Sequence, residues 1–160
     1  MVRVLGIDPG FDRTGWGVID QTGGNPTWVA HGCITTPKSS EFSDRLKLMR
    51  DELEKVIDTY APQCVAVEEL FFSTNAKTAI KVGMARGVII LTVADAGLRV
   101  VDITPNQVKQ GITGWGSADK KQVQTMVQRI LHLTDVPKPD DAADALAIAV
   151  VGGTVSTQPK

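Results

Sequence analysis

Two short apolar runs of the sequence each end in an acidic residue, and this feature most restricts the fold. Val2–Asp8 and Cys64–Glu68 have the length and composition of buried strands. A carboxylate at the end of a buried strand is costly without a partner, because it loses its hydration there. We therefore expect a sheet in which Asp8 and Glu68 lie at strand ends and share a partner.

The periodicity of the other segments completes the expected order of elements. Two further strands, 14–20 and 27–36, follow the first and predict an antiparallel meander, and a third buried strand is expected over 99–103. A right-handed crossover through 43–61 places the strand 64–68 parallel to the first. We predict an α/β fold with a mixed sheet. Helices are expected over 43–61 (Ser43 as candidate N-cap), 75–94, a short stretch from Pro105 capped by Thr104, 119–131 and 140–151, with a glycine-rich loop over 111–117.

Length and composition predict one domain over residues 1–151, followed by a disordered tail over 152–160. A chain of 160 residues can bury a sufficient core without disulfides. Cys33 and Cys64 lack metal-ligand spacing and are expected to be free thiols. The first residues lack a signal-peptide layout, and Val88–Ala94, the longest apolar run, is far shorter than the roughly 20 residues of a membrane span. We expect a cytoplasmic protein with no membrane partner.

Two more acidic residues, Asp141 and Asp144, are spaced i, i+3 and so share one helix face. Ligand sites of open α/β sheets gather at the carboxyl ends of the strands, where Asp8 and Glu68 are expected. Four clustered carboxylates need a cation, and oxygen-only ligands favour Mg²⁺ or Mn²⁺. Such a cluster is typical of two-metal phosphodiester hydrolysis.

The alternative is structural. Asp8 would then stabilise a turn, and the acids of 140–144 would favour a helix N-terminus. Periodicity alone does not choose between Glu68 and Glu69, or between Asp140 and Asp141.

The charge distribution is consistent with a nucleic-acid partner although the net charge is only −1. Residues 1–69 carry a net charge of −4, residues 70–132 of +5, and residues 133–160 of −2. A basic central segment between acidic ones predicts a phosphate-binding surface around a carboxylate cluster, or else a solvated lysine face.

A set of motifs in one order closely resembles the bacterial RuvC-type Holliday junction resolvases from about residue 3 to residue 151. The opening Gly6-Ile7-Asp8-Pro9-Gly10 alone is also found in actin-like ATPases and sugar kinases, so the specificity lies in the full set. The other motifs are Thr14-Gly15-Trp16-Gly17, Val67-Glu68, Asn75-Ala76, Ala85-Arg86-Gly87, Gln107-Val108-Lys109-Gln110, Gly116-Ser117-Ala118 and Asp141-Ala142-Ala143-Asp144-Ala145-Leu146-Ala147.

The resemblance implies an RNase H-like fold with a five-stranded mixed sheet flanked by helices. It implies a homodimer that resolves four-way DNA junctions in recombination and repair by paired, Mg²⁺-dependent nicking of opposing strands, with Mn²⁺ expected to substitute. Branch-migration motor proteins are implied partners. The family's catalytic, metal-holding acids fall on Asp8, Glu68, Asp141 and Asp144, which leaves Glu69 and Asp140 as bystanders.

The resemblance also places DNA-contacting residues. Lys109 and Lys120 correspond to basic residues beside the scissile phosphate, and Phe71 to an aromatic that contacts the junction, with Phe72 expected to pack. A further basic set follows the second acidic strand and either tracks a junction arm or is plain helix surface: Lys77, Lys81 and Arg86. The small residues Ala79, Gly83 and Gly87 fit either a dimer interface or packing on the sheet.

Two other functions compete with the nuclease. A junction-binding module with purely structural acids would bind DNA without cutting it. An actin-like ATPase needs two such domains, for which 160 residues are too few.

Overall fold

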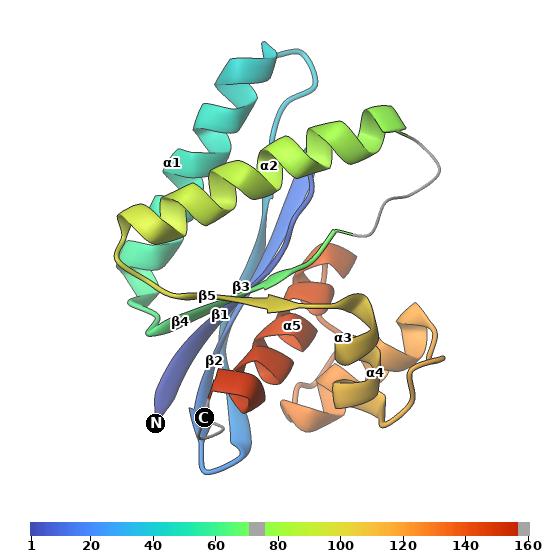
Figure 1. Ribbon diagram of the computed structural model, residues 1–160. Helices are drawn as coiled ribbons and strands as arrows, with labels where there is room; N and C mark the ends of the chain where they lie inside the picture. The colour runs from blue at the N-terminus through green and yellow to red at the C-terminus, as the bar shows by residue number, and fades with distance from the viewer. Residues whose placement is uncertain (71–75, 157–160) are drawn as a thin grey trace.

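The computed structural model describes residues 1–70 and 76–156 (Figure 1). Its five strands form one mixed sheet, as predicted, and the strand order is β3-β2-β1-β4-β5. The strands are β1 (Val2–Asp8), β2 (Arg13–Thr22), β3 (Asn25–Thr35), β4 (Cys64–Glu68) and β5 (Val100–Ile103). The helices are α1 (Phe42–Tyr60), α2 (Ala76–Asp95), α3 (Pro105–Thr113), α4 (Lys120–Ile130) and α5 (Asp140–Ser156).

The register of the sheet brings the carboxyl ends of β1, β4 and β5 to one edge. β1 pairs with β2 in antiparallel fashion, and β2 with β3, which confirms the expected meander. β1 and β4 run parallel, as do β4 and β5, with Ile7 opposite Val67 and Glu68 opposite Ile103. Side chains that follow these strands therefore meet at the same edge of the sheet.

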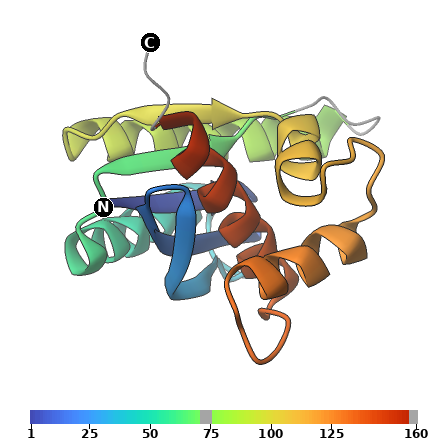
Figure 2. The ribbon, with the colours of Figure 1, turned by 90° about the horizontal axis from the view of Figure 1, so that it is seen from below.

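Helices cover both faces of the sheet (Figures 1 and 2). On one face, α1 and α2 enclose a core with Leu5, Ile7 and Val65. On the other face, α5 runs across the sheet and α3 and α4 pack against it, around Val4 and Ile148. Every side chain of α5 from Ala145 to Val151 is buried, so this helix is the centre of the second core.

Helix ends account for most differences from the sequence-based expectation. The N-cap of α1 is Glu41, which makes no side-chain capping bond, so the assignment of Ser43 as N-cap was wrong. Thr104 caps α3 through a capping box with Gln107, as its position before Pro105 predicts. α3 continues into the expected glycine-rich loop and ends only at Gly114, which adopts a left-handed conformation.

The expected tail over 152–160 was also placed wrongly at its start. α5 continues to Ser156, and both Gly152 and Gly153 are buried. An added Cβ at Gly152 would lie 2.3 Å from the Cβ of Ala66, so the glycine lets the last turns of the helix lie directly on β4. Residues 157–160 lie outside the described part of the chain. Cys33 and Cys64 are free thiols, as expected. Among the described residues, no helix has both the length and the apolar character needed to cross a membrane.

Candidate active site

Asp8 and Glu68 end neighbouring parallel strands and lie side by side. The pair Ile7 and Val67 directly precedes them in the β1–β4 ladder. Both acidic side chains are partly buried, while the residues just before them are fully buried. Two carboxylates with little access to water thus share one end of the sheet, as the two apolar runs predicted.

The start of α5 brings Asp141 and Asp144 to the same place, because two glycines let the helix touch the sheet. A Cβ at Gly15, which pairs with Asp8, would lie 1.9 Å from the carbonyl oxygen of Asp141. A Cβ at Gly6 would lie 2.2 Å from the carbonyl oxygen of Ala145. Any side chain at either position would displace α5 and its two carboxylates from Asp8.

The pKa values of the two strand-end acids reflect this crowding. Burial is the largest cause that raises the pKa of Asp8 from 3.8 to about 8. The negative charge of Glu68 follows, and then those of Asp144 and Asp141, while Lys120 opposes them. Burial and Asp144 raise the pKa of Glu68 to about 7. The cluster is therefore electrostatically unfavourable until a cation joins it.

Two basic side chains already partner the helix carboxylates. The Lys120 Nζ lies 2.9 Å from the Oδ2 of Asp144. The Oδ1 of Asp144 accepts a hydrogen bond of 3.3 Å from the side-chain amide of Gln124. The Arg13 Nε lies 3.0 Å from a carboxylate oxygen of Asp141. Lys120 was predicted at the site, whereas Arg13 was missed. Arg13 could have been found from the topology. It is the first residue of β2, which runs antiparallel to β1, so it lies at the edge where β1 ends.

Each adjacent acidic pair can be compared in the structure. The side chain of Asp140 is 71% exposed and 3.9 Å from Lys120, whereas those of Asp141 and Asp144 are 28% and 25% exposed. Glu69 follows the strand and its backbone N–H donates to the carbonyl oxygen of Ile103. The lower exposure of Asp141 favours it over Asp140, whereas Glu68 and Glu69 are both half-buried.

Within the described residues, no group of three or more acidic, histidine or cysteine side chains surrounds a space for a metal ion as it stands. Asp141 is instead paired with Arg13, and Asp144 with Lys120. The donor set nevertheless fits a hard divalent cation, since it consists of carboxylate oxygens. Burial and then the neighbouring carboxylates raise the pKa of Asp8, and a bound cation would oppose both effects.

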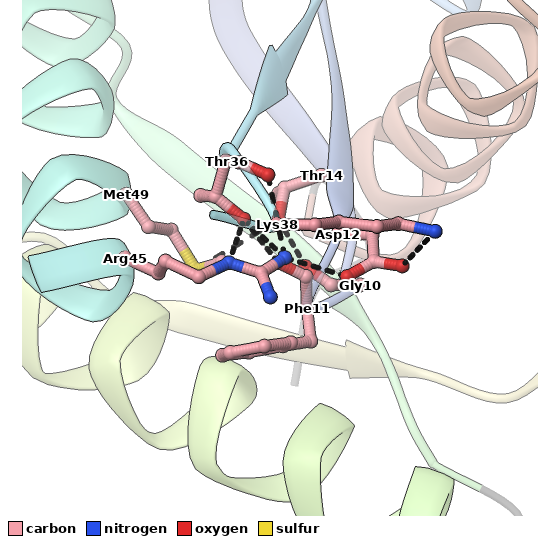
Figure 3. A network of polar contacts seen from close by, with 8 residues as sticks. All are labelled: Gly10, Phe11, Asp12, Thr14, Thr36, Lys38, Arg45 and Met49. Carbon is pink, nitrogen blue, oxygen red and sulfur yellow. Dashed lines mark hydrogen bonds and ion pairs between the residues drawn. The ribbon is translucent and has the colours of Figure 1, made fainter. Parts of the chain in front are cut away.

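A buried arginine fixes the turn that follows Asp8 (Figure 3). Arg45 of α1 is 7% exposed and donates to Asp12 at 2.5 Å and to the hydroxyl of Thr36 at 3.0 and 2.8 Å. Thr36 in turn donates to the carbonyl oxygen of Phe11 at 2.7 Å. The guanidinium also lies 4.0 Å from the centre of the Phe11 ring. Arg45 thus ties the β1–β2 turn to α1 and to the end of β3.

The turn is closed from its other side by Thr14, whose hydroxyl donates to the carbonyl oxygen of Gly10 at 2.8 Å. Lys38 completes the network 3.4 Å from the carboxylate of Asp12 (Figure 3). Arg45 was not predicted at the site. It lies four residues before Met49 and so on the buried face of α1, but helical spacing alone does not show what a buried arginine contacts.

Three other predicted residues, all lysines, lie on α3 and α2. Lys109 is half-buried on α3, and no ion pair joins it to the four carboxylates. Lys77 is exposed in the first turn of α2, and the Lys81 Nζ lies 5.6 Å from the centre of the Phe11 ring. Phe71 and Phe72 lie outside the described residues.

Arg86 has a structural role in the sheet edge. Its Nε donates to the carbonyl oxygen of Glu68 at 3.2 Å, and its guanidinium forms an ion pair with Asp102. The side chain is only 20% exposed. Arg86 therefore ties the end of β4 to β5 and supports the backbone that carries Glu68.

The sheet order and the acidic edge together define a protein of the RNase H-like class, with helices on both faces of a five-stranded mixed sheet. Within that class the chain belongs to the RuvC family: residues 4–152 match the model of "Crossover junction endodeoxyribonuclease RuvC". This family depends on divalent metal ions.

Proteins and structures similar to this chain support the assignment. The crossover junction endodeoxyribonuclease RuvC of Alkaliphilus oremlandii is 50% identical over 147 residues, covering 92% of this chain and 90% of its own. That of Caldicellulosiruptor saccharolyticus is 53% identical over 150 residues, covering 93% and 90%. The structure of T. thermophilus RuvC in complex with a Holliday junction substrate superposes with a TM-score of 0.92 at 34% identity, covering 98% of this chain and 95% of that one.

The pKa of Asp8 generates a prediction about stability. Because this pKa is higher in the folded protein than the ordinary 3.8, the folded state binds more protons, and stability falls as the pH rises from about 4 to 8. We expect Asp8→Asn to stabilise the metal-free protein by about 1–3 kcal/mol at pH 8, and by less at pH 5. Urea denaturation in EDTA at both pH values measures this difference.

The exposed Asp58→Asn is the matched control and should change stability by no more than about 0.5 kcal/mol. An Asp8→Asn protein that is less stable than the wild type at pH 8 would show that Asp8 has a favourable structural partner instead.

Proposed function

We propose that this chain is a structure-specific endodeoxyribonuclease that resolves four-way DNA junctions by metal-dependent hydrolysis, in recombination and repair. The observation that carries the proposal is the convergence of Asp8, Glu68, Asp141 and Asp144 at one sheet edge in a member of the RuvC family. The Holliday junction in the complex of the similar T. thermophilus protein supports the choice of substrate.

In this proposal the four carboxylates hold Mg²⁺, with Mn²⁺ able to substitute, since both are cations that oxygen ligands suit. When bound, the cations activate a water molecule and stabilise the leaving oxygen. Cation binding would displace the remaining proton from Asp8, whose pKa of about 8 leaves it partly protonated at neutral pH. It would also compete with Arg13 and Lys120 for the carboxylates of Asp141 and Asp144.

The basic partners of the cluster then become available to the DNA. Lys120, once released from Asp144, can place its ammonium against the scissile phosphate and stabilise charge in the transition state. Arg13 is 48% exposed and can do the same for a neighbouring phosphate. The water oxygen forms a bond to phosphorus and the bond from phosphorus to the 3′ oxygen breaks, which leaves 5′-phosphate and 3′-hydroxyl ends.

We assign further DNA contacts to the basic central segment. Lys109 lies on α3, which starts at the edge where Glu68 lies, and is proposed to contact a phosphate. Lys77 and Lys81, on the first two turns of α2, are proposed to follow a junction arm. Phe71 is proposed to stack on an unpaired base at the crossover. Arg86, which is tied to Asp102 and Glu68, is assigned to support of the strand end.

We propose a homodimer that forms through α2. Four residues of this helix with the spacing i, i+4, i+7, i+11 lie on one face: Ile80, Met84, Gly87 and Leu91. The three large side chains are 59%, 49% and 60% exposed, and a Cβ at Gly87 would meet no atom within 4 Å. An apolar stripe with a glycine at its centre suits a symmetric helix pair, and two active sites would suit two opposing strands.

Two further assignments rest on the family resemblance. Branch-migration motor proteins are proposed partners, since they would supply and move the junction. The cytoplasm is the proposed location, because the substrate is DNA.

The function is tested by cleavage of a synthetic mobile four-way junction and of a linear duplex of the same sequence. We expect paired, symmetric nicks in the junction alone, with Mg²⁺ and not with EDTA. Asp8→Asn should lower the rate at least about 10³-fold while leaving junction binding within about threefold, because only the carboxylate charge is removed. Gel mobility shift in EDTA measures the binding.

Asp58→Asn, remote from the cluster and exposed, serves as the control and should cleave like the wild type. Tight binding by the wild type without cleavage under Mg²⁺ or Mn²⁺ would contradict the nuclease function and show that the protein is a junction-binding module.

The dimer is tested by Met84→Glu, which places a charge in the apolar stripe. We expect the wild type to sediment as a dimer and this variant as a monomer at micromolar concentration, because a desolvated, unpaired carboxylate opposes the interface. Ser43→Glu on α1, which adds the same charge at an exposed site, should leave the dimer intact. Dimers formed equally by Met84→Glu would place the interface on another surface.

A further inference from the structure

The outer strand β3 presents a free edge over residues 30–35. β3 ends the sheet, and within the described residues its backbone pairs with β2 alone, apart from a weak bond from the Cys33 thiol to the Ile34 carbonyl oxygen. An unpaired edge offers alternating N–H and C=O groups to any other extended chain. Proteins commonly protect such edges with lysine, proline or a bulge.

Those protections lie at the other end of this strand. Pro26 and the register shift opposite Val18 and Ile19 both precede Ala30. The segment Ala30–Thr35 contains neither proline nor lysine, and its pairing with β2 is regular. Six residues of open edge, about 20 Å long, are therefore available for strand pairing.

A groove runs beside this same segment, between β3 and α1. It has a volume of about 490 Å³ and is lined on the strand side by residues 32–35. The helix side includes Leu48, Val56 and Thr59. Pockets of about this volume bind small molecules in other proteins, so the groove has room for a side chain. The open edge and the groove together form a site for an extended chain with one face against a helix.

Aromatic rings form the floor of the groove. Gly32 pairs with Trp16, and a Cβ at Gly32 would lie 2.6 Å from the indole ring, so the ring covers the place where a side chain would stand. The ring of Tyr60 lies 5.6 Å from that of Trp16. An apolar or aromatic side chain of an added strand could pack on this pair.

The charges of the groove favour a peptide over DNA. Its charged residues, Glu52 and Lys55, form an ion pair of 2.6 Å with each other. The groove therefore offers no surplus positive charge to a phosphate backbone. Antiparallel pairing of two β3 edges would place both α1 helices on the same face of the seam, and the Thr59→Trp variant tests for such self-association.

We propose that the edge of β3 over Ala30–Thr35 and the groove against α1 bind an extended segment of a partner protein by strand addition. Main-chain hydrogen bonds to β3 would supply affinity. An apolar side chain on the Trp16–Tyr60 floor would supply specificity. The groove lies on the α1 face of the sheet, opposite α5, although Arg13 contacts both Cys33 of this edge and Asp141. The proposed binding does not rest on the nuclease activity.

The test begins with a phage-displayed library of random 12-residue peptides selected on the full chain. Peptides that also bind Thr59→Trp are removed, since this exposed substitution fills the groove without entering the core. We expect enriched peptides with apolar residues at alternate positions and at least one aromatic. Asp58→Trp, at the adjacent exposed position outside the groove, should bind them like the wild type.

Synthetic versions of a selected peptide test the backbone pairing. Alternate N–H groups of a bound strand face β3, and the others face away. N-methylation of the peptide residues that face β3 should weaken binding at least about tenfold, and N-methylation of the other set by less than about twofold. Hydrogen exchange at the amides of residues 30–35 should slow when the peptide binds. Thr59→Trp should still cleave junctions like the wild type.

Three results would overturn the proposal. The first is the absence of any peptide that discriminates Thr59→Trp from Asp58→Trp. The second is equal binding by the two N-methylated versions of the peptide. The third is a different occupant of the groove. It would be seen as self-association of the protein that Thr59→Trp abolishes, or as displacement of the peptide by a 12-base-pair DNA duplex.

Discussion

The contact of α5 with the sheet is the interaction on which the rest of the structure depends. At Gly6 and Gly15 the helix backbone lies where a side chain would otherwise stand, so α5 and β1 touch without an intervening layer. This contact buries most of α5 and at the same time brings Asp141 and Asp144 beside the end of β1. The core and the candidate site therefore share one cause. A substitution that moved α5 outward by the width of a methyl group would disturb both.

The cluster that this contact creates is unfavourable by itself. Burial and like charges raise the pKa values of Asp8 and Glu68, and the basic residues Arg13 and Lys120 relieve only part of the repulsion. The surrounding structure holds the acids in place: Arg45 fixes the turn after Asp8, and Arg86 fixes the end of the strand that carries Glu68. Functional sites commonly include groups whose local interactions lower the stability of the fold, and stabilising contacts elsewhere offset this loss of free energy.

Much of this arrangement could be predicted from the sequence. The strands that carry Asp8 and Glu68 were predicted because buried strands consist mainly of apolar residues and are recognisable in the sequence. The i, i+3 spacing put Asp141 and Asp144 on one helix face. The roles of Arg13 and Arg45 were not predicted, because each depends on contacts between residues distant in sequence. The end of α5 was misplaced for a related reason. Gly152 and Gly153 suggest fraying in isolation, yet Gly152 lets the helix pack on β4 and Gly153 lies against Gln21 of β2.

The central claim is that these four carboxylates hold the divalent cation, and localised oxidative cleavage tests it most directly. Fe²⁺ replaces Mg²⁺ in the protein–junction complex, and hydrogen peroxide then generates hydroxyl radicals that cut the chain near the bound ion. We predict cuts near residues 8, 68 and 141–144 that excess Mg²⁺ suppresses and that are lost in Asp8→Asn. Cuts at other positions, or cuts at these positions that Mg²⁺ leaves unchanged, would contradict it.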